Sequence, residues 1–399
     1  MNEIIDKLPE IKISTLPEDL LCYGFDASGI ESFPSAVVWP GNTEDVVKVM
    51  KYAYENGIYI VPRGAGTGMT AGAVPSRGAI VLSFERMKGI LEINPGNLDV
   101  LCEPGVINGR LQRELEWKGL FYPPDPASMN FCTIGGNVAE NAGGPRAIKY
   151  GVTRDYVIEL EAVLPNGDIV STGVKTAKGV VGYDLTRLLT GSEGTLAVFT
   201  KMRLRVLPMP EEVICLLAIF KNLEASGDAV SRIISSGVVP RTLEFMDHEA
   251  IAAVESFKPV GLPRDAEAVL LIELDGHPSA ITKEAGNIAG ICQELGAEII
   301  MAEDEDAREQ LWVSRRSLSP ALYRIKPAKI NEDIVVPRSA VTEMLKRLRK
   351  LSERSGIKIV NFGHAGDGNI HVNIMVDRAD AEEYAKGLGL VRQIFEDVI

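Results

Sequence analysis

Cysteine is scarce in this chain, and no long apolar run occurs in it. The five cysteines are odd in number, scattered and without a CxxC pair, so we expect reduced thiols rather than a disulfide framework. The longest apolar stretches, 213–220 and 268–274, are far too short to cross a bilayer. The opening MNEIIDKLPE lacks the basic, apolar and cleavage regions of a signal peptide. These absences predict a cytoplasmic protein, which a partner could hold at the periphery of a membrane.

Basic residues are also in the minority. Forty-two Lys and Arg against fifty-five Asp and Glu give a net charge of −13, which argues against a whole-chain binder of nucleic acid or anionic membranes. No internal repeat or low-complexity tract occurs, so a solenoid or propeller is excluded. What remains is an ordinary globular composition, and 399 residues predict two or more domains.

The first half alternates helical and strand-like segments. Apolar spacing and flanking turn residues predict helices at 43–56 and 108–118 and strands at 58–61 and 79–84. Two further strands, 158–164 and 168–171, flank Asn166-Gly167 and are expected to form a hairpin.

A domain boundary is expected near Pro208 and Pro210. Beyond it, strands at 214–220 and 268–274 and helices at 223–236 and 279–295 predict a ferredoxin-like plait with its helices on one face. A basic amphipathic helix is expected at 341–354; its Lys346, Arg347, Arg349 and Lys350 form either a partner surface or, as we prefer, a solvated face.

Two glycine-rich segments interrupt this order. In the first, Gly64, Gly66 and Gly68 alternate directly after the strand at 58–61, which suits a nest of inward-pointing N–H groups for phosphate. It is neither a GxGxxG dinucleotide motif nor a P-loop, and by itself it could be a tight structural turn. The second segment, 123–156, is too long and polar for a passive connector, so the two together favour one large ligand.

The motifs in these segments resemble a known class of flavoproteins. Pro62-Arg-Gly-Ala-Gly-Thr-Gly68, Pro124-Asp-Pro, the run 133–144 and Gly182-Tyr-Asp-Leu-Thr with Gly191-Ser-Glu-Gly-Thr195 are similar to the FAD-binding domain of the vanillyl-alcohol-oxidase class. Within it the chain is most similar to the FAD-linked 2-hydroxy-acid dehydrogenases: the flavin-binding component of glycolate oxidase, and the D-lactate and D-2-hydroxyglutarate dehydrogenases. The resemblance implies an α+β protein with an N-terminal segment (1–33), a PCMH-type FAD-binding domain of two α/β subdomains (34–210) and a ferredoxin-like antiparallel-sheet cap domain for the substrate (211–399).

The same resemblance implies which residues hold FAD. Loop 63–68 would cradle the pyrophosphate, the stretch 133–144 with Gly151 and Thr153 would line the flavin and ribityl chain, and Glu193 would meet the adenine side. The implied set is Arg63, Gly64, Ala65, Gly66, Thr67, Gly68, Pro124, Asp125, Thr133, Gly135, Gly136, Asn137, Asn141, Ala142, Gly143, Gly144, Gly151, Thr153 and Glu193. Relatives that bind FAD covalently often carry a histidine at the end of the first loop, whereas this chain has none before residue 248; we therefore expect non-covalent FAD.

Two of the four histidines, His364 and His371, lie in one short motif near the end of the sequence. A period of two places His371 and Asn373 on one strand face, and the turn 365–369 could return His364 beside His371. The pair could bind a divalent cation or be surface groups of a hairpin. The resemblance favours the cation (Zn, Mn or Fe), because the family's HxGDGNxH motif supplies two metal ligands at these positions. In the family the metal binds the substrate's 2-hydroxyl and carboxylate near the flavin.

A carboxylate substrate also needs a cation. Residues 311–319 are expected to be helical, which places Arg315 and Ser319 on one face. An Arg-Arg pair on a helix is ordinarily solvated, but the family's Trp-x-x-Arg stretch implies that Arg315 binds the carboxylate, with Ser319 as a weaker helper. The family also has a lysine in the segment after this arginine. Lys326 and Lys329 are candidates for it, Asn331 lies nearer the expected position, and the assignment is left open.

The expected activity is oxidation of a D-2-hydroxy acid, D-lactate or glycolate, to the 2-oxo acid by hydride transfer to flavin, with Arg315, His371, Asn373 and Ser319 around the substrate. The chain carries no iron–sulfur or haem ligand set, so the electrons should leave to an iron–sulfur subunit, an electron-transfer flavoprotein or a quinone. A homodimer is compatible with the sequence. The alternative is a non-catalytic flavin subunit that transfers electrons within a complex. A UDP-sugar reductase would share the FAD domain but not the histidine motif.

A final helical stripe runs from Asp380, a capping-box candidate with Glu383, to residue 398. Members of the family continue into a Glu-His-Gly motif that supplies a third metal ligand. We therefore expect a metal site one ligand short, with FAD binding but weak or absent turnover by this chain alone.

Overall fold

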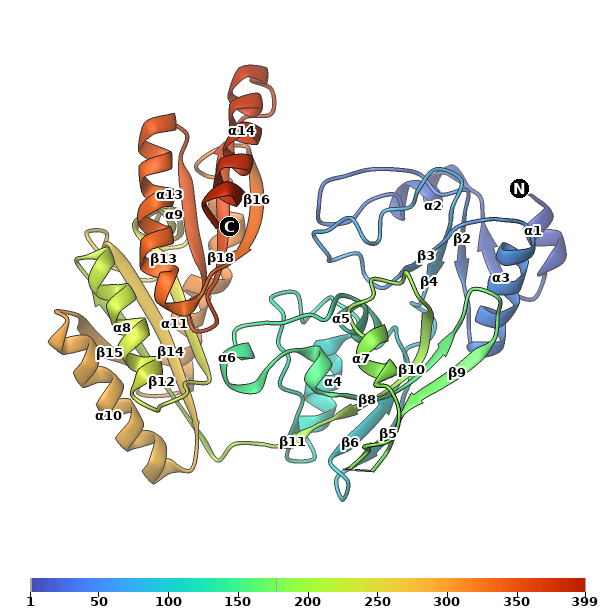
Figure 1. Ribbon diagram of the computed structural model, residues 1–399, viewed down its shortest axis with the longest axis horizontal. Helices are drawn as coiled ribbons and strands as arrows, with labels where there is room; N and C mark the ends of the chain where they lie inside the picture. The colour runs from blue at the N-terminus through green and yellow to red at the C-terminus, as the bar shows by residue number, and fades with distance from the viewer. Residues whose placement is uncertain (1, 177, 399) are drawn as a thin grey trace. The chain divides into compact units, whose positions relative to one another are not determined.

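A computed structural model describes residues 2–176 and 178–398 (Figure 1). The chain forms two compact units: the first comprises Met1–Gly144 and Gly151–Met209, and the second comprises Pro145–Tyr150 and Pro210–Ile399. The short segment Pro145–Tyr150 thus leaves the first unit in mid-chain to join the second. It carries α6 (Ala147–Tyr150), and the Tyr150 hydroxyl donates to Asp275 of the second unit at 2.8 Å.

The first unit contains a small sheet with helices beside it. Its strands lie in the order β1 (Lys12–Ser14), β2 (Ala36–Trp39), β4 (Ile80–Ser83), β3 (Ile60–Arg63), with β2, β4 and β3 parallel. The helices are α1 (Asn2–Lys7), α2 (Pro17–Cys22) and α3 (Thr43–Glu55). Asn42 caps α3 by accepting from the Asp45 N–H, and Val46 and Val49 bury the apolar face, so the helix expected at 43–56 is confirmed.

A second sheet in the first unit is antiparallel. Its order is β5 (Ile90–Asn94), β6 (Asp99–Cys102), β10 (Val198–Arg205), β8 (Val157–Val163), β9 (Ile169–Gly173), and β7 (Leu120–Phe121) pairs with β11 (Leu207–Pro208). The hairpin β8–β9 turns at Gly167, whose φ of +85° explains why glycine stands there. Beside the sheet are α4 (Asn108–Glu116), α5 (Ile134–Glu140), α7 (Leu185–Leu189) and the 3₁₀ turn Thr153–Asp155. The predicted hairpin and the predicted helix at 108–118 are confirmed.

The second unit is built on one antiparallel sheet of seven strands. The order is β15 (Glu298–Met301), β12 (Glu212–Phe220), β14 (Ala268–Gly276), β13 (Thr242–Asp247), β17 (Ile359–His364), β18 (Asn369–Val376), β16 (Ala328–Val335). With α8 (Leu223–Ser235) and α10 (Pro278–Glu294) as connections, the first four strands have the ferredoxin-like arrangement that the sequence predicted, and the other three widen it. The α+β class with a ferredoxin-like cap is confirmed, although strand β13 was missed.

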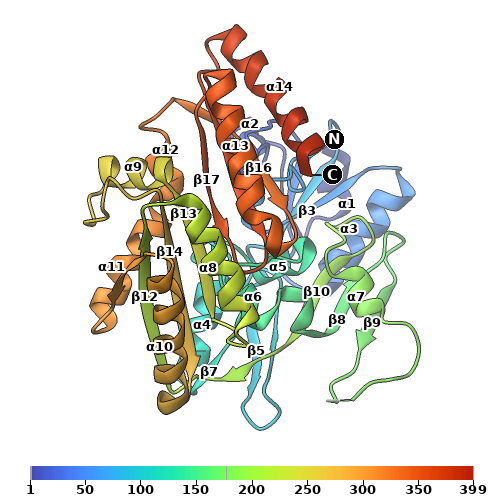
Figure 2. The ribbon, with the colours of Figure 1, turned by 60° about the vertical axis from the view of Figure 1, so that its left-hand side comes forward.

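Helices cover both faces of this sheet rather than one (Figures 1 and 2). One face packs under α8, α10, α13 (Val341–Ser355) and α14 (Ala381–Val398), and the other under α9 (His248–Phe257), α11 (Glu305–Arg316) and α12 (Leu318–Leu322). The expectation of a single covered face was wrong because α9, α11 and α12 were not assigned to the second face. The sequence of β14 agrees with double coverage, since its residues from Ala268 to Asp275 are all buried.

The basic side chains of α13 lie among acidic neighbours. Arg349 pairs with Glu267 at 2.7 Å and Lys346 with Glu224 at 3.4 Å, which neutralises much of the patch and agrees with a solvated face. At the start of α14, Asp380 accepts from the Glu383 N–H at 3.0 Å, whereas the Glu383 carboxylate accepts from the Asp377 N–H, so only half of the expected capping box forms.

In the described part of the chain, no helix combines the length and apolar character that a bilayer crossing requires. All five cysteines are free thiols, as expected.

Candidate active site

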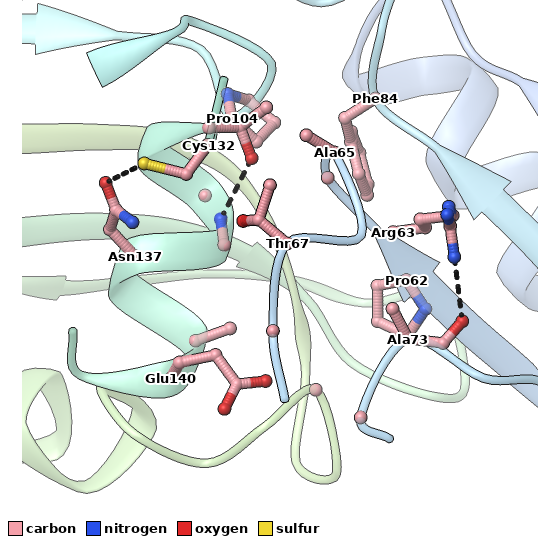
Figure 3. Close-up of a pocket in the computed structure, with 18 of the residues that line it drawn as sticks. Pro62, Arg63, Ala65, Thr67, Ala73, Phe84, Pro104, Cys132, Asn137 and Glu140 are labelled. Carbon is pink, nitrogen blue, oxygen red and sulfur yellow. Dashed lines mark hydrogen bonds between the residues drawn. The ribbon is translucent and has the colours of Figure 1, made fainter. Parts of the chain in front are cut away.

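A pocket in the first unit lies between the two glycine-rich segments. It encloses about 1100 Å³ of empty space including its open mouth. Figure 3 shows the loop after β3, with Ala65 and Thr67, running between Phe84 and the helix α5 that carries Asn137 and Glu140. Thr133 caps the start of α5, where its hydroxyl accepts from the Gly136 N–H. The pocket wall is therefore largely backbone and small side chains.

Arg63 supports the loop from behind. The residue is 7% exposed, and its guanidinium donates to the Phe25 carbonyl at 2.8 Å and the Ala73 carbonyl at 3.3 Å. The backbone of Gly66 passes beside the Arg63 guanidinium in the left-handed conformation, with φ +67°. A Cβ there would come 2.3 Å from the guanidinium, so glycine is required. Burial lowers the pKa of Arg63. The charges of Asp26 and Glu85 act in the opposite direction, so the guanidinium beside the pocket is partly balanced by acidic neighbours.

Close backbone approach also explains Gly135. A Cβ on Gly135 would come 2.6 Å from the Pro104 Cβ and 2.9 Å from the Pro104 carbonyl oxygen, which already accepts from the Gly135 N–H. Any larger residue would push α5 away from the Pro104 turn. The shape of the pocket thus depends on a close backbone contact between Gly135 and Pro104, which a side chain at residue 135 would prevent.

Twelve of the predicted FAD-binding residues line this pocket: Arg63, Gly64, Ala65, Gly66, Thr67, Gly68, Thr133, Gly135, Gly136, Asn137, Ala142 and Glu193. Pro124, Asp125, Asn141, Gly143, Gly144, Gly151 and Thr153 are not among its lining residues. Ala139 and Glu140, within the predicted stretch 133–144, also line it. The remaining lining residues were not predicted from the sequence: Pro62, Gly72, Ala73, Phe84, Pro104, Pro126, Ser128, Cys132, Gly194, Ala197, Val198 and Phe199.

The predicted residues outside the lining support its backbone. The buried Thr153 hydroxyl donates to the Ala142 carbonyl at 2.7 Å. Asn141 ends α5 in the left-handed conformation, φ +52°, and its side chain accepts from the Arg154 N–H. Gly144 passes so close to Asp125 that a Cβ would lie 2.4 Å from its carbonyl oxygen. These residues shape the pocket without facing it.

Two carboxylates, Glu140 and Glu193, lie at the edge of the pocket. Burial, with the charge of Glu193 as a second cause, raises the pKa of Glu140. Together with Arg63, these carboxylates give the pocket lining side chains of both charge signs.

A second cluster lies in the second unit, where β17 and β18 form a hairpin. The rings of His364 and His371 are 5.1 Å apart between centroids and meet edge to face. The turn between them brings residues seven apart in the sequence together, and the cross-strand register pairs Phe362 with His371. The expected return of His364 to His371 is confirmed.

Each histidine is held by a carboxylate through Nδ1. His364 contacts Glu244 at 2.6 Å and His371 contacts Asp333 at 2.8 Å. Burial disfavours the charged imidazole, but Glu244 outweighs it and raises the pKa of His364. Burial, joined by the charge of His364, lowers the pKa of His371 in spite of Asp333. Within residues 2–176 and 178–398 neither Nε2 has a hydrogen-bond partner, so both are available to a ligand.

Arg315 reaches the same cluster from α11. Its Nε donates to Glu244 at 2.7 Å, and its guanidinium carbon lies 4.9 Å from the centroid of the Phe362 ring. The neighbouring Arg316 points elsewhere and pairs with Glu309. Of the two arginines, Arg315 thus shares the Glu244 carboxylate with His364, whereas its implied role toward a substrate carboxylate stays a prediction.

The single helix expected over 311–319 was wrong. α11 ends at Arg316 and α12 begins at Leu318, with Ser317 between them. Pro320 explains the break, because its ring clashes with the carbonyl four residues earlier, that of Arg316. Ser319 consequently lies on α12, where its hydroxyl accepts from Lys329 at 3.1 Å.

β16 settles where the open lysine candidates lie. Lys329, Asn331 and Asp333 alternate on this strand and pair with Met375, Asn373 and His371 of β18, so their side chains share the face of the two histidines. Burial lowers the pKa of Lys329. Lys326 precedes the strand and pairs with Glu383 at 2.8 Å.

Asn373 is fully buried beneath the cluster, and its Nδ2 donates to the carbonyls of Val360 and His371, both at 3.3 Å. Among the residues that the structure describes, its Oδ1 has no hydrogen-bond partner. The residue thus has one unused acceptor in the interior.

The chemistry of these groups suits a divalent cation only in part. Two imidazoles with unengaged Nε2 atoms and carboxylate partners on Nδ1 match the usual arrangement of metal-binding histidines. In the part of the chain that the structure describes, however, no group of three or more His, Cys, Asp or Glu side chains is placed to hold a metal ion. Any further ligands would have to come from substrate, solvent or elsewhere.

Glu244 and Asp333 were not predicted from the sequence. Glu244 lies on β13, which was also missed, 120 residues before His364. Asp333 lies 38 residues before His371. The one available signal was a Glu in an otherwise apolar stretch, Leu243-Glu-Phe-Met246, where a buried carboxylate would need cationic partners.

The fold and the first pocket define an FAD-linked oxidoreductase. Residues 34–173 match the family described as FAD binding domain, and residues 209–399 match FAD linked oxidases, C-terminal domain. The chain is 44% identical over 381 residues to the glycolate oxidase subunit GlcD of Bacillus subtilis (strain 168), covering 95% of this chain and 81% of that protein. It is 36% identical to the D-lactate dehydrogenase of Archaeoglobus fulgidus, covering 93% of this chain and 83% of that one.

The chain therefore belongs to the family of FAD-linked oxidases that includes these proteins, and the predicted resemblance is confirmed. Two solved structures share its fold. Alkyldihydroxyacetonephosphate synthase has a TM-score of 0.80 at 17% identity, covering 99% of this chain and 80% of that one. p-Cresol methylhydroxylase has a TM-score of 0.79 at 17% identity, covering 96% and 84%.

Proposed function

We propose that this protein oxidises a D-2-hydroxy acid, with D-lactate or glycolate as the first candidates, to the 2-oxo acid. The observation that carries the proposal is the cluster of His364, His371 and Arg315 in the second unit. It combines two oriented imidazoles with a guanidinium, the groups that a hydroxyl and a carboxylate on adjacent carbons require. The names of the relatives, a glycolate oxidase subunit and D-lactate dehydrogenases, support the same substrate class.

Arg315 would bind the substrate carboxylate. Its Nε is engaged by Glu244, so the two terminal nitrogens stay free for two parallel hydrogen bonds to a carboxylate. Phe362 lies under the guanidinium and limits its motion. Lys329, on the strand face of the histidines, is the lysine we assign to a supporting role.

His364 and His371 would hold a divalent cation, Zn, Mn or Fe, together with the substrate. Such an ion lowers the pKa of a bound hydroxyl and so favours loss of its proton. Glu244 and Asp333 keep Nδ1 of each ring engaged, so that Nε2 can serve as the ligand. Burial lowers the pKa of His371, which favours the neutral imidazole that ligation requires, whereas Glu244 raises the pKa of His364, so a metal would have to displace a proton there.

FAD would occupy the pocket of the first unit non-covalently and would supply the acceptor for the substrate's C2 hydride. Loop 63–68 would contact the pyrophosphate through backbone N–H groups, with Arg63 adding positive charge from behind. The reduced cofactor would pass its electrons to an external acceptor: an iron–sulfur subunit, an electron-transfer flavoprotein or a quinone. The printed name of the Bacillus relative, a subunit, is compatible with such a partner.

Anaerobic reduction of the bound flavin tests the proposal. The purified FAD-containing protein is mixed with D-lactate, glycolate and D-2-hydroxyglutarate, each with its L-enantiomer where one exists, and flavin absorbance is followed by stopped flow. Slow bleaching by a D-2-hydroxy acid, its loss after EDTA and its return with Mn²⁺ or Zn²⁺ are expected, because the described residues place two imidazoles but no third His, Cys, Asp or Glu side chain to hold the metal. If no 2-hydroxy acid bleaches the flavin with either metal present while dithionite does, the protein is a non-catalytic flavin subunit and the proposal fails.

A further inference from the structure

Glu244 joins two groups that the proposed reaction uses separately. Its side chain is fully buried, and each carboxylate oxygen accepts from a different donor: Oε1 from Nδ1 of His364 at 2.6 Å, and Oε2 from Nε of Arg315 at 2.7 Å. Glu244 lies directly opposite His364 in the pairing of β13 with β17, whereas Arg315 comes from α11. One carboxylate thus connects a strand pair to a helix.

We propose that Glu244 is a positioning residue of the active site, which fixes the ring of His364 and the guanidinium of Arg315 at the same time. The inference rests on the proposed function for the roles of these two partners. The two hydrogen bonds of Glu244 do not depend on the proposed function, since both are present in the protein without substrate or metal.

The consequence for His364 concerns its tautomer. A carboxylate only accepts, so the Nδ1 of a neutral His364 must carry the proton, and the Nε2 lone pair is then free for a ligand. The consequence for Arg315 concerns its direction. With Nε engaged on Glu244 and the Phe362 ring under its plane, only the two terminal nitrogens remain for a substrate.

Asp333 provides a natural comparison. It holds His371 in the same way, but one oxygen, Oδ1, accepts from both His371 at 2.8 Å and Asn369 Nδ2 at 2.7 Å. An asparagine at 333 would keep that single oxygen and both hydrogen bonds. A glutamine at 244 has only one oxygen for two donors, so its NH₂ group must face either His364 or Arg315.

The matched variants Glu244→Gln and Asp333→Asn test the proposal. Mn²⁺ binding is titrated by EPR on the FAD-containing protein, and oxalate binding is followed by the shift of the flavin spectrum. Glu244→Gln is expected to weaken Mn²⁺ binding about 10- to 100-fold and oxalate binding at least about tenfold. Asp333→Asn should change each by less than about threefold, because its hydrogen bonds survive. Glu244→Gln protein with wild-type affinity for both probes overturns the proposal.

A measurement on the wild-type protein guards against misfolding of the variant and against failure of the proposed function. The chain has four histidines, so long-range ¹H–¹⁵N spectra of ¹⁵N-histidine protein can be assigned with single His→Gln variants. At alkaline pH, without metal or substrate, His364 should be the Nδ1–H tautomer. A Nε2–H tautomer overturns the proposal even if no 2-hydroxy acid is oxidised. Conversely, if His364 shows the expected tautomer but no 2-hydroxy acid reduces the flavin, the positioning role of Glu244 is supported and only the proposed function fails.

Discussion

The guanidinium of Arg315 lies over the ring of Phe362, 4.9 Å from its centroid. The same ring is 5.4 Å from that of His371. Phe362 therefore packs against a proposed carboxylate-binding group and a proposed metal ligand, and it is itself 6% exposed. This buried ring gives the cluster a rigid apolar floor that excludes water from one side of the guanidinium.

Replacing Phe362 by leucine should weaken substrate binding without abolishing it. The variant keeps an apolar side chain but loses the attraction between ring and guanidinium, worth about 0.5–2 kcal/mol. We expect KM for the hydroxy acid to rise about 2- to 30-fold with a smaller change in kcat. Steady-state kinetics with an artificial electron acceptor would measure it. A KM unchanged within error would show that the ring does not hold Arg315.

Two neighbouring arginines provide a matched pair. Arg315→Met removes the terminal nitrogens proposed to bind the carboxylate, and each lost charge-assisted hydrogen bond costs about 1.5–3 kcal/mol. KM should therefore rise at least about 100-fold. Arg316 is half exposed and paired with Glu309, so Arg316→Met should leave KM within about twofold. Equal effects of the two substitutions would contradict the proposed role of Arg315.

Gly135→Ala should reduce the FAD content of the purified protein. The new Cβ would come 2.6 Å from Pro104, so the Pro104 turn or α5 must shift and the pocket must change shape. The flavin-to-protein absorbance ratio should fall to less than about half that of the wild type under equal purification.

Gly290→Ala is the control for that experiment. Gly290 lies in α10 with nothing within 4 Å of an added Cβ. Alanine there should stabilise the helix by about 0.5–1 kcal/mol and leave the FAD content unchanged. Full flavin content in Gly135→Ala would mean that this contact does not shape the cofactor pocket.

Asp247 should make folding stability depend on pH between about 4 and 6. The carboxylate is buried at the start of α9, and burial raises its pKa to about 6 from 3.8. As pH rises through this range, the unfolded chain releases the proton before the folded one, so folding loses stability on the order of 3 kcal/mol. The protonated carboxyl is therefore stabilising below about pH 4, and that contribution is gone above about pH 6.

Asp247→Asn tests this dependence. The asparagine stays neutral, so the difference in free energy of unfolding between variant and wild type should shift in favour of the variant from pH 4 to pH 7. Urea unfolding followed by circular dichroism at both pH values measures the shift. The baseline cost of the substitution, which replaces an acceptor facing two donors of Asn361, cancels in the comparison. A difference independent of pH would contradict the raised pKa.

Much of both sites could be predicted because their key residues are neighbours in sequence. The glycines at 64, 66 and 68 follow a strand directly, and the turn between His364 and His371 brings together residues only seven apart. A period of two correctly separated His371 and Asn373 from Ile370 and Val372. In each case, local backbone geometry is enough to place the side chains.

The sequence by itself determined the glycine loops and the histidine turn, since these depend on local conformation, and its resemblance to relatives singled out Arg315 rather than Arg316 as the predicted carboxylate-binding residue. Only the tertiary structure decided which carboxylates hold the histidines. Glu244 lies 120 residues before His364, on strand β13. That strand was not predicted, because its sequence mixes apolar and charged residues. The position of Glu244 follows from the order of strands in a seven-stranded sheet, and strand order depends on the packing of the whole unit rather than on any local pattern.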